Sequence, residues 1–149
     1  MKPEWTLKPF YELTLDELYA ILHLRMEVFV VEQNCVFQDC DFKDQVSHHL
    51  MGWFEGKLVA ITRLVPPGTS YAEPSIGRVV TSPAYRKMKF GRELMSRSVE
   101  NCYQLFGKQP IRIGAQLYLK NFYESFGFCQ VGEPYPEDGI NHITMLLPG

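Results

Sequence analysis

Residues 76–99 constrain the fold most, because they join a strand, a turn and a helix without interruption. The run at 76–81 is rich in β-branched residues, which is typical of a buried strand. Pro83 ends that strand, since proline has no N–H group to donate to a β-ladder. From about Phe90 onwards, apolar residues recur at helical spacing and predict a helix with one buried face. The chain must therefore build at least a sheet that packs against this helix.

The turn between that strand and that helix is basic and ends in a glycine. Arg86, Lys87 and Lys89 supply three positive charges just before Gly91. The first turn of a helix has unpaired N–H groups and carries the positive end of the helix dipole, so it attracts phosphate. A solvent-exposed basic loop ahead of a packed helix would have the same composition. The local sequence leaves both interpretations open.

The strand, turn and helix together resemble the acyl-CoA-binding motif of the GNAT acetyltransferase superfamily, Arg/Gln-x-x-Gly-x-Gly/Ala. Arg86 and Gly91 match the motif, whereas Lys89 occupies the position of its first glycine. Lysine adopts a positive φ less readily than glycine, so this difference bears on the conformation of the loop. The resemblance implies acetyl-CoA as the co-substrate. It also implies that the following residues bind it: Val79, Val80, Thr81, Arg86, Lys87, Met88, Lys89, Phe90, Gly91, Arg92, Gln116 and Asn121.

A second segment, residues 116–128, resembles the superfamily pattern Asn-x-x-Ala-x-x-Leu-Tyr-x-x-x-Gly-Phe. Gln116 replaces the asparagine and can still hydrogen-bond the co-substrate, while Leu119 replaces the alanine. Tyr123 occupies the tyrosine position, so the resemblance implies that its phenol protonates the departing thiolate as a general acid. A buried aromatic ring whose hydroxyl finds one hydrogen-bond partner is the alternative for Tyr123.

The amine that attacks the thioester must first lose a proton. Glu32, Asp44 and His49 are the candidates for this base by residue type. Histidine titrates nearest to neutrality, although a histidine on a strand is more often structural. A chain of water molecules could remove the proton instead, and holding the amine beside the thioester contributes to the rate by itself. The residues alone do not decide between these alternatives.

Residues 24–33, Leu-Arg-Met-Glu-Val-Phe-Val-Val-Glu-Gln, closely resemble the ElaA-like branch of the superfamily, and the resemblance extends over nearly the whole chain. Arg25 falls on or beside the apolar stripe of a predicted helix, where a charge needs a partner. Asp39, Asp41 and Asp44 follow at a spacing similar to a calcium loop, but the glycine at its sixth position and the closing glutamate are absent. We therefore expect no metal site, and a loop that presents carboxylates to a cationic acceptor amine.

In chain order, the pattern predicts one domain over residues 1–149 with an α/β (α+β) fold of the GNAT type. Strands are expected at residues 5–10, 48–54, 58–64, 76–81, 111–116, 128–132 and 142–147, and helices at 15–30, from about 90, and at 118–126. Residues 133–141 are rich in turn formers and are expected to connect the last two strands. The resemblance implies a mixed, mostly antiparallel central sheet flanked by helices. In that sheet, the strand at 76–81 splays from its neighbour and binds the pantetheine arm through its backbone.

Composition excludes several classes of function. The 15 basic and 17 acidic residues give a net charge of −2, which argues against a nucleic-acid binder. The N-terminus is too polar for a signal peptide and no apolar run could span a bilayer, so we expect a cytoplasmic location. No Cys-x-x-Cys pair occurs, and Cys35, Cys40, His48 and His49 fit no common zinc spacing. The remaining cysteines, Cys102 and Cys129, are expected to be small core residues.

These observations predict an acetyl-CoA-dependent N-acetyltransferase in which a primary amine of an unidentified acceptor attacks the thioester directly. A non-catalytic acyl-CoA-binding regulatory module is the alternative, because it would need residues 86–91 but neither Tyr123 nor a base. The motifs Gly-x-x-x-x-Gly-Lys-Ser/Thr and Gly-x-Gly-x-x-Gly, which mark other nucleotide-binding folds, are absent. The expected partner is a small-molecule or peptide amine. A homodimer is left open, and neither nucleic acid nor a membrane is expected.

Overall fold

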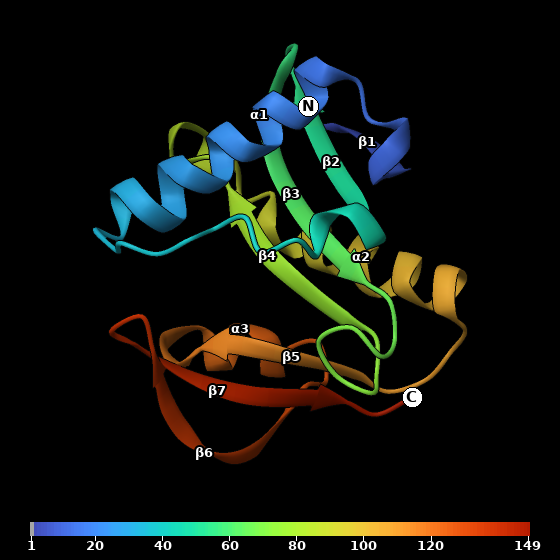
Figure 1. Cartoon of the computed structure of the whole chain (residues 1–149), viewed down its shortest axis with the longest axis vertical. Coiled ribbons are helices and arrows are strands. Elements are labelled where there is room, and N and C mark those ends of the chain that lie inside the picture. The colour runs from blue at the N-terminus through green and yellow to red at the C-terminus, as the bar shows by residue number, and fades with distance from the viewer. Residues whose placement is uncertain (1) are drawn as a thin grey trace.

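The computed structural model describes residues 2–149 and contains two sheets that come together at one end (Figure 1). The first sheet has the strand order β1-β2-β3-β4, and the second has the order β5-β7-β6. All neighbouring strands within the two sheets are antiparallel, which confirms the predicted mostly antiparallel α/β fold. The strands are β1 (Glu4–Pro9), β2 (His48–Phe54), β3 (Lys57–Val65), β4 (Ser75–Thr81), β5 (Ile111–Gln116), β6 (Cys129–Glu137) and β7 (Ile140–Leu147).

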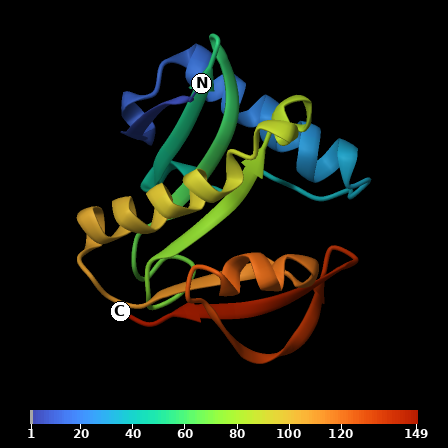
Figure 2. The ribbon, with the colours of Figure 1, turned by 180° about the vertical axis from the view of Figure 1, so that it is seen from behind.

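Helices cover both faces of the first sheet, with α1 on one side and α2 on the other (Figure 1 and Figure 2). Side chains of β3 alternate between these faces: Ile61 packs with Ile21 and Leu24 of α1, whereas Ala60 packs with Leu94 of α2. The helices are α1 (Leu15–Arg25), a π-helix (Met26–Glu32) that continues it, α2 (Gly91–Phe106) and α3 (Lys120–Glu124). None of the helices that the structure describes has both the length and the apolar character needed to cross a bilayer.

The helix predicted at residues 15–30 begins as expected but ends differently. Thr14 and Glu17 form a capping box, in which each side chain accepts a hydrogen bond from the other's backbone N–H. Beyond Arg25 the helix widens into the π-helix, and the wider turn includes a bond from Cys35 N to Val30 O at 3.0 Å. The apolar residues at 28–30 suit either kind of helix, so their spacing could not reveal the change.

The helix predicted at residues 118–126 also differs at its boundaries. A 3-10 helix, Leu117–Leu119, comes first and turns the chain from β5 into α3. Helix α3 stops at Glu124, and Gly127 has the left-handed φ of 98° that favours glycine after a helix. Short 3-10 segments are common at helix ends, so the sequence located the helix but not its limits.

Strand β4 is an outer strand of the first sheet and faces β5 of the second. The two strands meet at their starts, where Arg112 N donates a hydrogen bond to Pro74 O at 3.1 Å. From that point they diverge toward Thr81 and Gln116, and Figure 1 shows the gap widening between them. This divergence is the splayed strand that the sequence predicted.

A β-bulge bends β4 within the splayed region. Between the Ile61–Val80 pair and the Arg63–Gly77 pair, two residues of β4 lie opposite one residue of β3. Arg78 is the first of these two and has a φ of 50°, which is uncommon for a residue other than glycine. The bulge changes the alternation of β4, so that Arg78 points toward the loop that follows the π-helix.

The last hairpin is longer than the sequence predicted. Strand β6 continues to Glu137 instead of ending at Gly132, and the turn is Asp138–Gly139, with φ values of 50° and 78°. Gly132 and Pro134 fall in a stretch where three residues of β6 lie opposite one residue of β7. Glycine and proline occur in bulges as well as in turns, so composition alone misplaced the connection.

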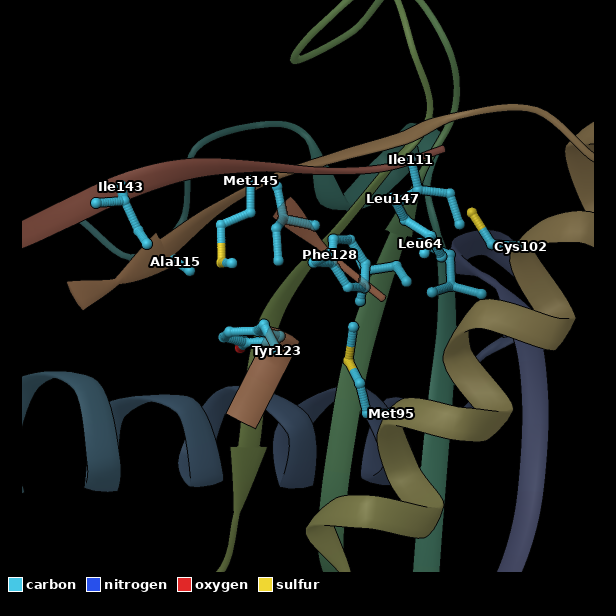
Figure 3. Packing of buried hydrophobic residues seen from close by; sticks show 12 residues of the cluster. Leu64, Met95, Cys102, Ile111, Ala115, Tyr123, Phe128, Ile143, Met145 and Leu147 are labelled. Carbon is cyan, nitrogen blue, oxygen red and sulfur yellow. The ribbon is translucent and has the colours of Figure 1, made fainter. Parts of the chain in front are cut away.

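A core between the second sheet, α2 and α3 joins the two sheets. Figure 3 shows Ala115 and Ile143 pointing from β5 and β7 toward Tyr123 of α3. Cys102 of α2 is fully buried in this core as predicted, and burial raises the pKa of its thiol to about 12. Cys129 is exposed, so its predicted place in the core was wrong. It begins the outer strand β6, where alternation turns its side chain to solvent.

Candidate active site

A cavity of about 680 Å³ fills the space between β4 and β5 where these strands separate. Its walls include residues from both segments that matched the motifs, the turn before α2 and the region of α3. They also include residues from the π-helix and from the hairpin of β6 and β7. The lining residues lie within the ranges 28–37, 76–81, 86–94, 113–123 and 137–142.

Strand β4 presents its backbone to the cavity. Because it is an edge strand, the N–H and C=O groups along its outer side have no ladder partner where it diverges from β5. Val79, Val80 and Thr81 all line the cavity. The Val80 side chain packs in the cluster beneath α1, so this part of β4 offers mainly backbone groups. An extended chain that carries amides can pair with such an edge as an added strand does.

The basic turn lies at the start of α2, and only part of it reaches the cavity. Arg86 and Gly91 line the cavity, whereas Lys87, Met88 and Lys89 lie in the same turn outside its walls. Helix α2 starts at Gly91 with no side-chain cap, so the N–H groups of its first turn keep free hydrogen-bonding capacity. The uncapped end of a 16-residue helix beside a cavity is a favourable place for an anion.

Phe90 and Arg92 direct their side chains away from the cavity, although both were predicted to contact the co-substrate. The Phe90 ring is buried and packs on Phe54, with 5.5 Å between the ring centroids. The guanidinium of Arg92 lies 4.8 Å from the centroid of the Phe126 ring and donates a hydrogen bond to Ser125 Oγ at 3.1 Å. Only the backbone groups of these two residues remain available to a ligand.

Lys89 adopts the conformation that the motif assigns to its glycine. Its φ is 57° and its ψ is 46°, which is the left-handed region, and its N–H donates to Arg86 O at 3.0 Å. Lysine therefore takes up, at this position, a conformation that glycine adopts more readily. A side chain in the left-handed region costs about 1–2 kcal/mol, so the turn carries a modest strain.

Glu32 reaches the cavity, but it is engaged in an ion pair. Its two carboxylate oxygens accept hydrogen bonds from Arg86 Nη1 and Nη2 at 2.7 Å and 2.6 Å. The hydrogen bonds from Arg86 lower the pKa of Glu32 below its usual value. A carboxylate with a lowered pKa is a weaker proton acceptor, so Glu32 suits the positioning of Arg86 better than the role of a base.

Three arginines and three aspartates form a network beside the cavity. We call it the arginine–aspartate network, and its members are Arg25, Arg63, Arg78, Asp39, Asp41 and Asp44. Arg25 is 1% exposed and donates from Nε to Asp39 at 2.8 Å and from Nη1 to Asp44 at 2.9 Å. Arg78 of the β4 bulge donates to the second oxygen of Asp39 at 2.9 Å. The partner that Arg25 was predicted to need is therefore a pair of aspartates in the following loop.

The loop at residues 34–45 does not present its carboxylates to an acceptor, which corrects the prediction. Asp39, Asp41 and Asp44 each accept hydrogen bonds from arginine side chains. Burying a carboxylate without a partner costs several kcal/mol, so carboxylates in a partly buried loop are used to neutralise buried cations. The sequence showed how these aspartates are spaced, but it did not show that Arg63 and Arg78 would lie against them.

His49 lies in β2 outside the cavity, and Asp44 is enclosed in the network. A ring nitrogen of His49 donates to the carbonyl oxygen of Asp44 at 2.9 Å, and burial lowers the pKa of this histidine. Neither residue lines the cavity. The structure therefore brings only Glu32, of the three predicted bases, to the cavity.

Tyr123 of α3 lines the cavity and is 5% exposed. Its ring makes edge-to-face contacts with Phe122 and Phe128, at centroid distances of 5.3 Å and 6.1 Å. Burial raises the pKa of Tyr123 well above its usual value, and the nearby Tyr118 adds to the shift. The phenol therefore stays protonated at neutral pH and can act as a proton donor. Asn121, two residues earlier in α3, does not line the cavity.

Gln116 lines the cavity at the end of β5 and pairs with Gln33, the last residue of the segment that resembles the ElaA-like branch. Its amide exchanges two hydrogen bonds with the amide of Gln33, at 3.2 Å and 3.3 Å. This pair connects the end of β5 to the residue that follows the π-helix. Glu137, Asp138 and His142 also line the cavity. Glu137 and Asp138 were not singled out because residues 133–141 were assigned to a connection, and His142 was expected only as the first residue of the last strand.

Comparison with known proteins agrees with this geometry. A family model described as the acetyltransferase (GNAT) domain matches residues 25–147. This chain belongs to the GNAT acetyltransferase family. Protein ElaA of Escherichia coli strain K12 is 45% identical to this GNAT chain over 144 residues, which cover 95% of the chain and 94% of ElaA. The chain is therefore a GNAT-type acyltransferase of the ElaA-like branch.

Two crystal structures extend the match to the whole GNAT fold. The structure of Escherichia coli ElaA superposes with a TM-score of 0.90 at 44% identity, over 97% of this chain and 98% of that one. An acyl-CoA N-acyltransferase from Pseudomonas aeruginosa superposes with a TM-score of 0.92 at 44% identity, with the same coverage of 97% and 98%. The GNAT fold implies an acyl-CoA as co-substrate.

Proposed function

We propose that the chain transfers the acetyl group of acetyl-CoA to a primary amine, which attacks the thioester directly. The observation that carries this proposal is the cavity at the divergence of β4 and β5. It combines an unpaired strand edge, an uncapped helix start and a buried tyrosine that stays protonated. These three features match the amide-bearing arm, the phosphates and the leaving sulfur of an acyl-CoA.

The backbone of β4 and the start of α2 hold the co-substrate in this proposal. Backbone groups of Val79, Val80 and Thr81 pair with the amides of the pantetheine arm, because they lie on the free edge. The backbone N–H groups at the uncapped start of α2 attract the phosphates, and the Arg86 guanidinium, which also pairs with Glu32, adds positive charge beside them. Gln116 supplies an amide on the opposite wall, and Asn121 remains a candidate for a contact just outside the cavity.

Tyr123 acts as the general acid in this proposal. Attack of the amine breaks the bond between carbon and sulfur, and the departing thiolate takes the phenolic proton. The raised pKa of Tyr123 supports this role, because the hydroxyl keeps its proton until the thiolate forms. Among the described residues, no side chain forms a hydrogen bond with this hydroxyl that would compete with the thiolate.

The closed end of the cavity supports acetyl over longer acyl groups. Where β4 and β5 meet, the cavity is bounded by Ile76 and Ile113, each of which is 2% exposed. Both pack with Leu64 and Met95 in the core that joins the two sheets. Filled apolar packing at this end leaves little room for additional methylene groups, and enlarging such a space would cost packing energy.

The test is transfer from acetyl-CoA, butyryl-CoA and octanoyl-CoA to a panel of primary amines that spans polyamines, amino acids, aminoglycosides and short peptides. Thiol release and the mass of the product are measured together. Gly91→Glu is the matched control, because the added Cβ would meet Phe122 and Thr81 only at 4.0 Å, so the fold tolerates it. The added carboxylate should repel the phosphates and abolish both CoA binding and transfer.

We expect an acetylated amine as product, with acetyl-CoA as the best donor. CoA binding without transfer to any amine would support the regulatory alternative. Thiol release without an acetylated product would identify hydrolysis. Unchanged CoA affinity in folded Gly91→Glu, measured by calorimetry, would remove the start of α2 from the proposal.

A further inference from the structure

Of the described histidines, only His142 lines the cavity. It lies in β7 and is 9% exposed. Its Nδ1 is 2.8 Å from the carbonyl oxygen of Ile140, and its Nε2 is 3.6 Å from Oε2 of Glu137. The ring also stacks on Tyr135 of β6, with 5.9 Å between centroids. An imidazole that lines the cavity and is held at Nδ1 and by stacking, with its other nitrogen facing a carboxylate, is suited to proton transfer.

His142 and Tyr123 lie on opposite faces of the second sheet. Ala115 pairs with Ile143 across β5 and β7, and both point toward Tyr123 in the core (Figure 3). The next pair along the ladder is Gln116 with His142, and successive residues of a strand point to opposite faces. An amine can therefore approach from the His142 side while Tyr123 stays on the side of the departing sulfur.

The contact with Ile140 determines which nitrogen of His142 carries the proton. A carbonyl oxygen only accepts hydrogen bonds, so the nitrogen at 2.8 Å from it must be an N–H donor. In the neutral ring the other nitrogen, Nε2, then has a free lone pair. We propose that Nε2 of His142 is the general base that takes the proton from the acceptor ammonium, and that Glu137 is a positioning residue that pairs with the resulting imidazolium. This inference rests on the proposed acetyl transfer.

The charged groups around His142 favour this role. Glu137 of β6 is the nearest of them, and its side chain is 60% exposed, so it can move to accept the new N–H. Tyr135 of β6 remains neutral, because burial raises its pKa, and Gln116 of β5 is uncharged. The remaining ionisable groups on the cavity wall are Asp138, Cys35, Glu32, Arg78, Arg86, Tyr118 and Tyr123, with Tyr71 beside Tyr135. Arg86 and Glu32 neutralise each other, and Arg78 is neutralised by the network.

The proton and electron balance of the step is complete without a further reactant. Nε2 of His142 takes one proton from the ammonium, and the neutral amine forms a bond to the thioester carbon. The bond between carbon and sulfur then breaks, and the thiolate takes the proton of Tyr123. The new amide nitrogen loses its remaining extra proton, which returns to the Tyr123 phenolate through water. The imidazolium releases its proton to solvent, so one proton is produced for each amide.

The first test needs no acceptor amine, because it measures which nitrogen of the His142 ring carries the proton. In the wild-type protein with uniform nitrogen-15 labelling, long-range proton–nitrogen NMR spectra report which ring nitrogen carries the proton. Comparison with His142→Asn identifies the His142 signals. We expect a protonated Nδ1 and an unprotonated Nε2 in the neutral ring. A protonated Nε2 would overturn the proposal, because that atom could not then accept a proton.

The second test uses the amine that the wild-type protein acetylates fastest in the panel above. His142→Asn is the matched variant, since its side-chain amide can still donate to Ile140 O but cannot act as a base. We expect kcat/KM to fall by about a hundredfold or more near neutral pH, and the loss to shrink as alkaline solution supplies neutral amine. CoA affinity should stay within about twofold, because His142 lies away from the strand edge and the helix start.

Glu137→Gln and His23→Gln complete the second test. Glu137→Gln should lower kcat/KM by less than His142→Asn and shift the acidic limb of its pH profile. His23 is exposed on α1, so its variant should match the parent. An active His142→Asn with the pH profile of the parent would overturn the proposal. If the parent acetylates no amine, the proposed function fails, and the ring-nitrogen spectra alone decide the protonation of His142.

Discussion

The two sides of the cavity are held in place by different kinds of force. The β4 side, residues 76–91, consists of a bulged edge strand and a turn, and it follows from local sequence signals. The loop side, residues 32–45, has little regular structure and is held by the arginine–aspartate network. The backbone surface of β4 and of the turn before α2 is therefore encoded by residues that are close together in the sequence. The opposite side depends on contacts between residues far apart in the sequence.

The two sides meet at Arg78. Its bulge belongs to β4, and its side chain donates to the Asp39 carboxylate at 2.9 Å and to the Asp39 carbonyl at 2.9 Å. The network contains three positive and three negative side chains, so its charges balance. Balanced pairs with several hydrogen bonds are the arrangement in which buried charges persist in proteins. A change in the network should therefore lower the free energy of unfolding, whereas removal of the proton donor Tyr123, which lies in α3 outside both sides, should lower the rate of transfer.

Tyr123→Phe should give the largest effect and should leave the loop side unchanged. The variant keeps the ring and its packing but removes the proton donor. We expect kcat to fall by about a hundred- to ten-thousand-fold, because this is the usual contribution of general acid catalysis. CoA affinity should be nearly unchanged, and stability should change by less than about 1 kcal/mol.

Steady-state kinetics on a working acceptor provide the measurement for Tyr123→Phe. Tyr103→Phe in α2 is the control, because Tyr103 lies outside the cavity and its loss of a hydroxyl should not affect kcat. A donor whose thiol has a lower pKa should reduce the loss, since its thiolate needs less protonation. If kcat of Tyr123→Phe stayed within about threefold of the parent, Tyr123 would be a packing residue and solvent would protonate the thiolate.

Arg25→Met should give the largest loss of stability and tests the loop side. Removing Arg25 leaves a network of three aspartates with two arginines, in which Asp39 keeps only Arg78 and Asp44 keeps only Arg63. We expect the free energy of unfolding to fall by about 3–5 kcal/mol. Arg97→Met is the control, because the exposed pair of Arg97 with Glu93 should contribute only about 0.5 kcal/mol.

Urea unfolding of both arginine variants provides the comparison. If Arg25→Met and Arg97→Met lowered the free energy of unfolding by equal, small amounts, the network would not be what holds the loop side. If Arg25→Met lost much of its free energy of unfolding but its folded molecules still bound CoA, the β4 side would not depend on the network.

Acid should weaken the arginine–aspartate network through Asp41. Burial alone would raise the pKa of Asp41, but hydrogen bonds and charge from Arg63, with help from Lys43 N–H and Arg78, lower it from 3.8 to about 2. A lowered pKa in the folded state means that the ionised carboxylate stabilises the fold above the unfolded value. That contribution is lost as the pH falls through the folded value.

Unfolding curves of the parent and Asp41→Asn between about pH 6 and pH 2 test this direction. The parent should be more stable at the upper end, and the difference between the two proteins should shrink as the pH approaches about 2. A difference that is constant over this range would show that Asp41 is not ionised preferentially in the folded state.

The sequence predicted the β4 side well and the loop side poorly, for physical reasons. The strand, the turn and the helix around Gly91 follow from propensity, proline chemistry and periodicity, all of which act over a few residues. The partners of Asp39 could not be predicted, because Arg63 and Arg78 come from strands that only the tertiary fold brings together. His142 was predicted to lie in the last strand, but its neighbours Tyr135 and Glu137 were assigned to a connection, because a bulge near Gly132 was taken for a turn.

Lys89→Gly should give the smallest effect and is the sharpest test of how the β4 side is encoded. Lys89 has a φ of 57°, so glycine at this position removes a strain of about 1–2 kcal/mol. Glycine also costs about 0.5–1 kcal/mol in conformational entropy, so we expect a net gain in stability of about 0.5 kcal/mol. Lys87→Gly is the matched control, since it removes the same charge from the preceding 3-10 helix, where glycine brings no relief of strain. Lys87→Gly should therefore lose about 0.5–1 kcal/mol, opposite in sign to Lys89→Gly. Urea unfolding of the two variants measures the sign directly. If both lost stability by the same amount, the left-handed conformation at residue 89 would not be the feature that shapes the turn before α2.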